Sequence, residues 1–265
     1  KEYISKFSTA YNLGFKNIFH VIVYRVLLFF SIHPVCLIKG NFLRGVFFEK
    51  PKLTNTNNSL DIPIDGFKYF GHKKISINSS LPNWFLDPFS NQSFENNMPW
   101  WKISDFDNEI GDIKIIWEAS RMNWLIPFVQ KIKTGNFEHL HQLNHLMNDW
   151  CIHNQPYKGF NWKCGQEASI RVLNCICALL ILDAEDKPSN ALKNFIEVHL
   201  DRIYPTIQYA KAQNNNHGIS EAAALYVGSS LISDNYKIKK YQDLGRKLLE
   251  DRVKILIEDD GTFSQ

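Results

Sequence analysis

The chain has 265 residues, a formal net charge of +3 and 45% hydrophobic residues. Its length permits one large domain or two small ones, and its composition lies within the range of globular proteins, outside that of disordered or collagen-like chains. The near balance of 30 Lys and Arg against 27 Asp and Glu argues against a nucleic-acid-binding protein with a broad basic face. A local patch for an anionic ligand is compatible with this balance.

The cysteine and histidine positions predict neither disulfides nor a metal site. Five cysteines are an odd number, and they form no CxxC pair. Cys175 and Cys177 lie two apart on an expected helix, so we interpret them as small core or boundary residues. His141 and His145 lie four apart without an acidic third ligand beside them, which favours a polar helix face. We expect no metal and no cofactor.

The most apolar segment, residues 15–38, is interrupted by Lys16, His20 and Arg25 and contains Pro34. A membrane-spanning helix needs roughly 20 consecutive apolar residues, so we predict no stable membrane span here. The segment also lacks the ordered parts of a signal peptide. A core helix is favoured, and a helix lying on a membrane surface is the alternative.

Two parts of the chain differ in pattern. Residues 1–107 contain the apolar segment and then a stretch rich in Pro, Asn and Ser with short alternating pieces such as residues 73–77, so we predict a helix followed by a loop-rich lead-in with a few short strands. Residues 108–265 have helical periodicity, which makes the predicted class mainly all-α. The expected helical runs are 112–133, 137–153, 165–183, 189–210, 217–232 and 236–258.

Short joins between these runs, such as residues 134–136 and 187–189, indicate antiparallel helical hairpins. Stacked hairpins build a bundle, a solenoid or a toroid of α/α pairs. Because no fixed sequence period is present, a toroid or a bundle is favoured over a solenoid.

The first candidate site motif places Glu118 and Arg121 three residues apart on a helix, next to Trp117. This spacing lets the two charged side chains pair. The alternative is a solvated ion pair flanked by core tryptophans.

The second motif follows an aromatic loop that contains Trp162. Glu167 and Arg171 lie four apart on the helix that begins after it. A tryptophan at a helix mouth can stack on a sugar ring, and arginine binds a carboxylate in a bidentate fashion. A purely structural Glu167–Arg171 pair is the alternative.

The third motif contains Asn215, Asn216 and His217 at the start of an apolar helix. The exposed N–H groups and the dipole of a helix N-terminus favour an anion. Glu221, four residues later, lies below His217 and is placed to fix its tautomer. An Asn-rich cap with a surface histidine is the alternative.

The order of these motifs resembles that of the heparinase II/III-like polysaccharide lyases, a family that also contains alginate lyases. The resemblance covers roughly residues 105–265. It implies an incomplete (α/α) toroid with a groove for an acidic polysaccharide, followed in full-length members by an antiparallel β-sandwich domain that we expect beyond this chain. The motifs that carry it are Asp112-Ile113-Lys114, Trp117-Glu118-x-x-Arg121, Asn161-Trp162, Glu167-x-x-x-Arg171, Asn215-Asn216-His217-x-x-x-Glu221 and Asp260-Gly261.

The resemblance also implies residue roles. Asn216 and His217 match the residues that bind the uronate carboxylate during catalysis. The family's catalytic Tyr follows the Asp-Gly motif, so we expect it beyond Gln265, together with a histidine of the sandwich domain. Substrate-binding residues that line or brace the groove would be Trp117, Glu118, Arg121, Trp162, Glu167, Arg171, Asn215 and Glu221, whereas Tyr204, Tyr209 and Tyr226 are expected to be packing residues.

The sequence therefore predicts a lyase that cleaves uronate-containing polysaccharide by β-elimination, with this chain carrying the carboxylate-binding side and inactive alone. Two alternatives are a non-catalytic carbohydrate-binding or scaffold toroid and an α/α-toroid glycoside hydrolase. The hydrolase would need two carboxylates that face each other across the groove, and Glu118 and Glu167 are the only candidate pair. The resemblance implies a bacterial protein that is periplasmic, secreted or associated with the cell envelope.

Overall fold

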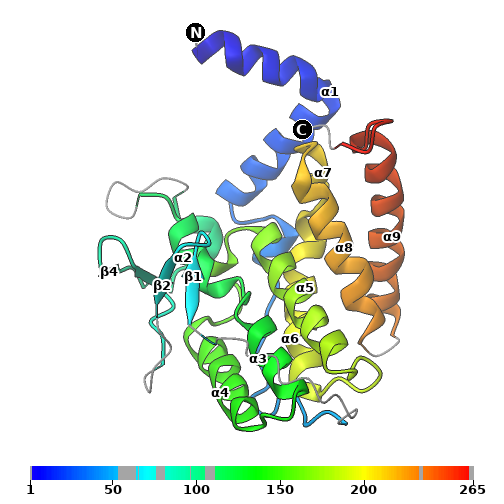
Figure 1. Cartoon of the computed structure of the whole chain (residues 1–265). Helices are drawn as coiled ribbons and strands as arrows, with labels where there is room; N and C mark the ends of the chain where they lie inside the picture. The colour runs from blue at the N-terminus through cyan, green and yellow to red at the C-terminus, as the bar shows by residue number, and fades with distance from the viewer. Residues whose placement is uncertain are drawn as a thin grey trace.

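The computed structural model describes residues 2–52, 64, 66–75, 81–95, 97–104, 111–232 and 235–262, with side chains from residue 14 onward. The described residues are mostly helical, which confirms the predicted mainly all-α class (Figure 1). The Asp-Gly motif lies at the end of the described part, whereas residues 105–110 of the region of resemblance lie outside it.

Helix α1 (Glu2–Phe29) projects from the rest of the chain and bends at Gly14, whose φ is +75° (Figure 1). The expectation that its apolar part is a core helix is wrong, because Phe15 is 91% and Phe29 82% exposed. Only one face of its second half packs on the body, where Tyr24 stacks on Tyr209. The segment Gly14–Cys36 is long and apolar enough to cross a membrane, with a mean hydropathy of 1.8 and 11% of the window buried. The absence of a membrane span stays a prediction.

The lead-in contains short elements, as expected. The 3₁₀ helix η1 (Pro34–Cys36) follows α1, and strands β1 (Phe67–Tyr69) and β2 (Lys73–Ile75) form an antiparallel hairpin in which Phe67 lies opposite Ile75. A second hairpin joins β3 (Leu86–Asp87) and β4 (Gln92–Ser93), and the 3₁₀ helix η2 (Trp100–Lys102) follows. Strand β2 confirms part of the predicted 73–77 strand, and residues 76–77 lie outside the described residues.

The helical part follows the predicted order, with short joins between successive elements. Its elements are α2 (Lys114–Ser120), α3 (Leu125–Lys133), α4 (Glu138–His153), the 3₁₀ helix η3 (Phe160–Trp162), α5 (Gly165–Ile181), α6 (Asn190–Ile203), the 3₁₀ helix η4 (Tyr204–Thr206), α7 (Ile207–Ala212), α8 (Asn216–Ser230) and α9 (Tyr236–Leu256).

Two predicted runs are each divided into two helices. Pro127 lacks an N–H, so the run 112–133 cannot continue through it, and Pro127 instead lies in the first turn of α3. The break falls at Met122, whose φ is +62° and whose side chain is fully buried. Pro205 divides the run 189–210 in the same way, between α6 and α7.

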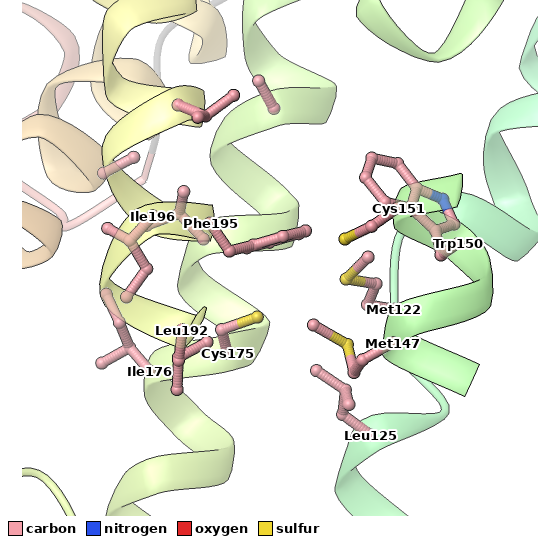
Figure 2. Packing of buried hydrophobic residues seen from close by; sticks show 14 of the residues in the cluster. Met122, Leu125, Met147, Trp150, Cys151, Cys175, Ile176, Leu192, Phe195 and Ile196 are labelled. Carbon is pink, nitrogen blue, oxygen red and sulfur yellow. The ribbon is translucent and has the colours of Figure 1, made fainter. Parts of the chain in front are cut away.

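The helices pack side by side around one hydrophobic core. Helix α5 contacts α3, α6 and α8, and α8 contacts α9. The lead-in belongs to the same core, because Phe47 and Trp84 are each 1% exposed within it. Figure 2 shows part of this core, in which Met122, Leu125, Met147, Trp150 and Cys151 face Cys175, Ile176, Leu192, Phe195 and Ile196.

Gly245 of α9 packs directly against the backbone of α8. A Cβ atom at Gly245 would lie 2.6 Å from the Tyr226 nitrogen and 2.8 Å from the Ala222 carbonyl oxygen, and backbone cannot swing aside as a side chain can. We therefore expect Gly245→Ala to lower the free energy of unfolding by about 2 kcal/mol, because the two helices must move apart.

Urea denaturation would measure the effect of Gly245→Ala, with Lys247→Ala on the exposed face of α9 as the control. Replacing a glycine inside a helix with alanine normally stabilises the folded protein. A more stable Gly245→Ala variant would therefore contradict the close packing of α8 and α9.

Candidate functional site

A cavity of about 490 Å³ lies where helices α5 and α8 begin. Its volume lies within the range of small-molecule binding sites. It is lined from several elements, so it depends on the tertiary structure. The lining residues are Tyr24, Gly111, Asp112, Ile113, Lys114, Trp117, Lys163, Cys164, Gly165, Arg202, Thr206, Tyr209, Gln213, His217 and Glu221.

The cavity combines positive charge with aromatic surface. Lys114, Lys163 and Arg202 line it, together with the rings of Trp117 and Tyr209. The N-termini of α5 and α8 also meet there, and each adds the positive end of a helix dipole. Such a cavity favours an anionic ligand that has a flat, partly apolar body.

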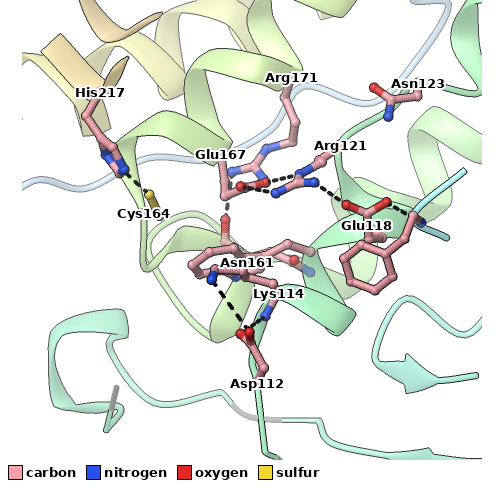
Figure 3. Close-up of polar contacts among 12 residues, drawn as sticks. Asp112, Lys114, Glu118, Arg121, Asn123, Asn161, Cys164, Glu167, Arg171 and His217 are labelled. Carbon is pink, nitrogen blue, oxygen red and sulfur yellow. Dashed lines mark hydrogen bonds and ion pairs between the residues drawn. The ribbon is translucent and has the colours of Figure 1, made fainter. Parts of the chain in front are cut away.

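His217 lies at the cavity wall between Cys164 and Glu221. Its Nδ1 is 4.0 Å from Cys164 Sγ (Figure 3). The same atom is 3.7 Å from Glu221 Oε1, which confirms the predicted contact between His217 and Glu221. Burial disfavours the imidazolium, but the interactions with Cys164 and Glu221 outweigh it and raise the pKa of His217 to about 10. His217 is therefore a cation at neutral pH.

Glu221 is held in a space that only glycine leaves open. A Cβ atom at Gly165 would lie 2.7 Å from the Glu221 carboxylate. The Glu221 side chain is 4% exposed, and burial raises its pKa although His217 and Arg202 act in the opposite direction. Among the described residues, Glu221 Oε2 has no hydrogen-bond partner. The carboxylate therefore positions His217 from below and retains an unused acceptor atom.

The asparagines before α8 have different roles. Asn215 is the N-cap, and its Oδ1 accepts a hydrogen bond from the His217 backbone nitrogen at 3.1 Å. Asn215 therefore caps α8 and does not line the cavity, and its role in substrate binding stays a prediction. Asn216 begins α8 with an exposed side chain and does not line the cavity, although His217 beside it does.

Glu118, Arg121 and Glu167 form a buried ion network beside the cavity (Figure 3). Arg121 donates to both oxygens of Glu167 at 2.8 Å and also pairs with Glu118, which confirms the predicted Glu118–Arg121 pairing. Glu118 Oε2 accepts from the Phe70 backbone nitrogen at 2.9 Å. The carboxylate side chains are only 6% and 3% exposed, so this network braces α2 against α5 and is no solvated surface pair.

The predicted pairing of Glu167 with Arg171 is wrong, because Glu167 binds Arg121 from the other helix. Arg171 is fully buried and donates through Nε to His199 Nε2 at 2.9 Å and through Nη2 to the Asn161 carbonyl oxygen at 2.7 Å. Burial lowers its pKa to about 10. Arg171 therefore stabilises the core and does not reach a ligand.

Trp162 is also 0% exposed, so the prediction that it stacks on a sugar is wrong. Its Nε1 donates to the Asn154 carbonyl oxygen, and its ring packs 4.8 Å from that of His199. Trp117 is the tryptophan that lines the cavity, where its Nε1 donates to the Phe160 carbonyl oxygen at 2.9 Å.

Sequence reasoning missed Tyr24, Cys164 and Arg202 as lining residues. The ring of Tyr24 stacks on Tyr209 with a centroid distance of 4.0 Å, and burial raises the pKa of Tyr24 well above its ordinary value. Tyr209 was expected only to pack, but it also lines the cavity. No sequence spacing links Tyr24 to residues more than 130 positions away, so only the tertiary structure brings it to this site.

The raised pKa of His217 predicts how stability changes with pH. A cationic group with a raised pKa stabilises the folded state fully below its unfolded pKa of 6.5, and this contribution is lost as the pH rises toward about 10. We therefore expect the stability difference between the wild type and His217→Gln to be largest below pH 6.5 and to shrink above it. Thermal melts over this range measure the difference, and a constant gap would contradict the prediction.

Metal binding has no support from the geometry of the described residues, where no group of three His, Cys, Asp or Glu side chains is arranged to hold an ion. Comparisons of the chain with protein-family models, with curated proteins and with solved structures found no match. The function is therefore inferred from the residues and their arrangement.

Proposed function

We propose that the chain carries the carboxylate-binding side of a lyase that cleaves uronate-containing polysaccharide by β-elimination. The observation that supports this most is the cavity at the start of α8, which joins cationic His217 to further cations and aromatic rings. Sugars present flat faces to aromatic rings, and uronates add a carboxylate that cations and helix N-termini bind. The antiparallel helix pairs are compatible with an (α/α) toroid, and we propose that architecture together with the lyase function.

The chemical problem in this reaction is the weakly acidic proton at C5 of the uronate. Neutralising the neighbouring carboxylate stabilises the negative charge that develops when the proton leaves. In the proposed reaction, the His217 imidazolium pairs with that carboxylate. Asn216, to which the resemblance gives the same role, has an exposed side chain that does not line the cavity, so His217 carries the proposal. Glu221 acts as a positioning residue that keeps His217 oriented and protonated.

A general base must also reach the C5 proton. Tyr24 and Tyr209 line the cavity, but the raised pKa of Tyr24 disfavours the tyrosinate that would act as base. His217 is protonated at neutral pH and is no base there. The resemblance to the polysaccharide lyases implies that a Tyr beyond Gln265 supplies the base, together with a β-sandwich domain, in a bacterial protein of the periplasm, cell envelope or exterior, and we include this in the proposal.

The alternative of a glycoside hydrolase is disfavoured by the ion network. Glu118 and Glu167 both bind the guanidinium of Arg121, so they converge on one cation and do not face each other across a groove. A non-catalytic carbohydrate-binding domain is compatible with the same cavity, and it predicts binding without product.

Ultraviolet absorbance of the unsaturated uronate product would test the proposal. The full-length protein and this chain are each incubated with a panel of acidic polysaccharides, with His217→Gln as the variant. Product from the full-length protein that is lost in His217→Gln and absent with this chain alone supports the proposed lyase and its missing base. Binding without product on every polymer would favour the carbohydrate-binding alternative.

A further inference from the structure

Cys164 has a chemical environment that differs from those of the other cysteines. It is the N-cap residue of the 17-residue helix α5 and lines the cavity, with its Sγ 4.0 Å from His217 Nδ1 (Figure 3). A helix N-terminus and a neighbouring cation both stabilise a thiolate, which is the nucleophilic form of cysteine.

Two buried guanidiniums add to the positive charge at Cys164. Arg171 and Arg202 both interact electrostatically with it, and their hydrogen bonds go to backbone carbonyls, a histidine and a hydroxyl group. None of these hydrogen bonds from Arg171 or Arg202 goes to a carboxylate, so they leave both positive charges unneutralised. Among the described residues, the charged and titratable groups that interact with Cys164 or line its cavity are Tyr24 of α1, Asp112, Lys114 and Arg121 at the two ends of α2, Lys163 before α5, Arg171 of α5, Arg202 of α6, and His217 and Glu221 of α8.

A second observation indicates that the place beside Cys164 is built for a ligand. Glu221 is buried, lines the same cavity, and has an oxygen without a hydrogen-bond partner among the described residues. An unpartnered buried acceptor is costly, so a donor group in the cavity would satisfy it. Cys164 therefore lies at a cavity whose lining residue Glu221 has a buried oxygen without a hydrogen-bond partner among the described residues.

We propose that Cys164 is a nucleophilic thiol that exchanges with small-molecule disulfides at this cavity. The Cys164 thiolate attacks one sulfur of the disulfide, a new S–S bond forms as the old one breaks, and the other half leaves as a thiolate. One disulfide is consumed and one is formed, so the step needs no other oxidant. The adduct occupies the cavity and excludes an anionic ligand from His217, and a reducing thiol reverses it.

The other cysteines provide internal controls. Cys177 lies on the same helix as Cys164 but is exposed on another face, so it reports the reactivity of an ordinary accessible thiol. Cys151 and Cys175 are buried, and burial raises the pKa of each thiol. These two residues react only if the chain unfolds.

Competitive alkylation with iodoacetamide, followed by peptide mass spectrometry, measures the reactivity of each thiol in the intact chain. We expect Cys164, beside the His217 cation and at the start of α5, to react about tenfold faster than Cys177 and to lose that advantage in His217→Gln. Oxidised glutathione should form a mixed disulfide at Cys164, and Cys164→Ser should abolish it.

Two results would overturn the proposal. The first is that Cys164 reacts no faster than Cys177 in the wild type. The second is that His217→Gln leaves the alkylation rate of Cys164 unchanged, while Cys151 and Cys175 remain unalkylated and so show that the variant is folded. If His217→Gln unfolds the chain, the wild-type comparison decides alone. Because alkylation does not require lyase activity, this test can fail or succeed independently of the proposed function.

Discussion

Under the proposed lyase activity, His217→Gln is expected to lower the kcat/KM of the full-length protein on a uronate-containing polymer by about a hundredfold, as loss of a charge-stabilising group does in other enzymes. The reason is that glutamine keeps a polar side chain but removes the cation that neutralises the carboxylate. His217 lines the cavity, and its side chain is 24% exposed, so the replacement fits the site. Product absorbance measures the loss.

His153→Gln is the matched control for this variant. His153 lies at the end of α4, and its Nδ1 is 3.3 Å from Asp149 Oδ1, four residues earlier. It is therefore another histidine with an acidic partner one helical turn away, but it does not line the cavity. We expect His153→Gln to retain activity. Equal losses in the two variants would mean that His217 acts through stability, and retained activity in His217→Gln would exclude it from the reaction.

Arg121→Met is expected to reduce the free energy of unfolding by about 3 kcal/mol, because it leaves two buried carboxylates without their cation. Arg121 donates to both oxygens of Glu167 and also pairs with Glu118, and both carboxylate side chains are less than a tenth exposed. Methionine retains much of the apolar stem, so the lost charge accounts for most of the change. Urea denaturation monitored by circular dichroism gives the value.

Arg246→Met tests the same substitution at an exposed ion pair. Arg246 pairs with Glu250 one turn later on α9, and the two side chains are 68% and 57% exposed. Water and salt screen such a pair, so we expect almost no change in stability. If Arg121→Met were as mild as Arg246→Met, the buried network would not brace α2 against α5.

Individual helices were predictable where local sequence decides them. Helices α4, α5, α8 and α9 begin and end within a few residues of the predicted runs, because their periodic apolar residues form one continuous face between short turns. The runs that contain Pro127 and Pro205 were predicted as single helices and are divided, since proline cannot continue a helix through its interior. The apolar face of α1 was expected in the core and is mostly exposed.

The pairings within the candidate site were predictable only along one helix. Glu118 with Arg121 and His217 with Glu221 are such pairs, and both contacts are present. Spacing gave the wrong partner for Glu167, because Arg121 at the end of a neighbouring helix donates hydrogen bonds to both of its oxygens, whereas Arg171 donates to His199 and to the Asn161 carbonyl oxygen. Helical spacing describes neighbours on one helix and contains no information about the next.

The sequence by itself determined the mainly helical class, the order of the helices, and the contacts between residues one turn apart, because these depend on periodicity and local turns. The tertiary structure decided which side chains reach solvent and which charges share a cavity. It buried Trp162 and Arg171, and it brought Tyr24, Cys164 and His217 together from three separate helices or their ends. Burial and long-range contact depend on how helix faces pack against one another, and this packing is a property of the whole chain.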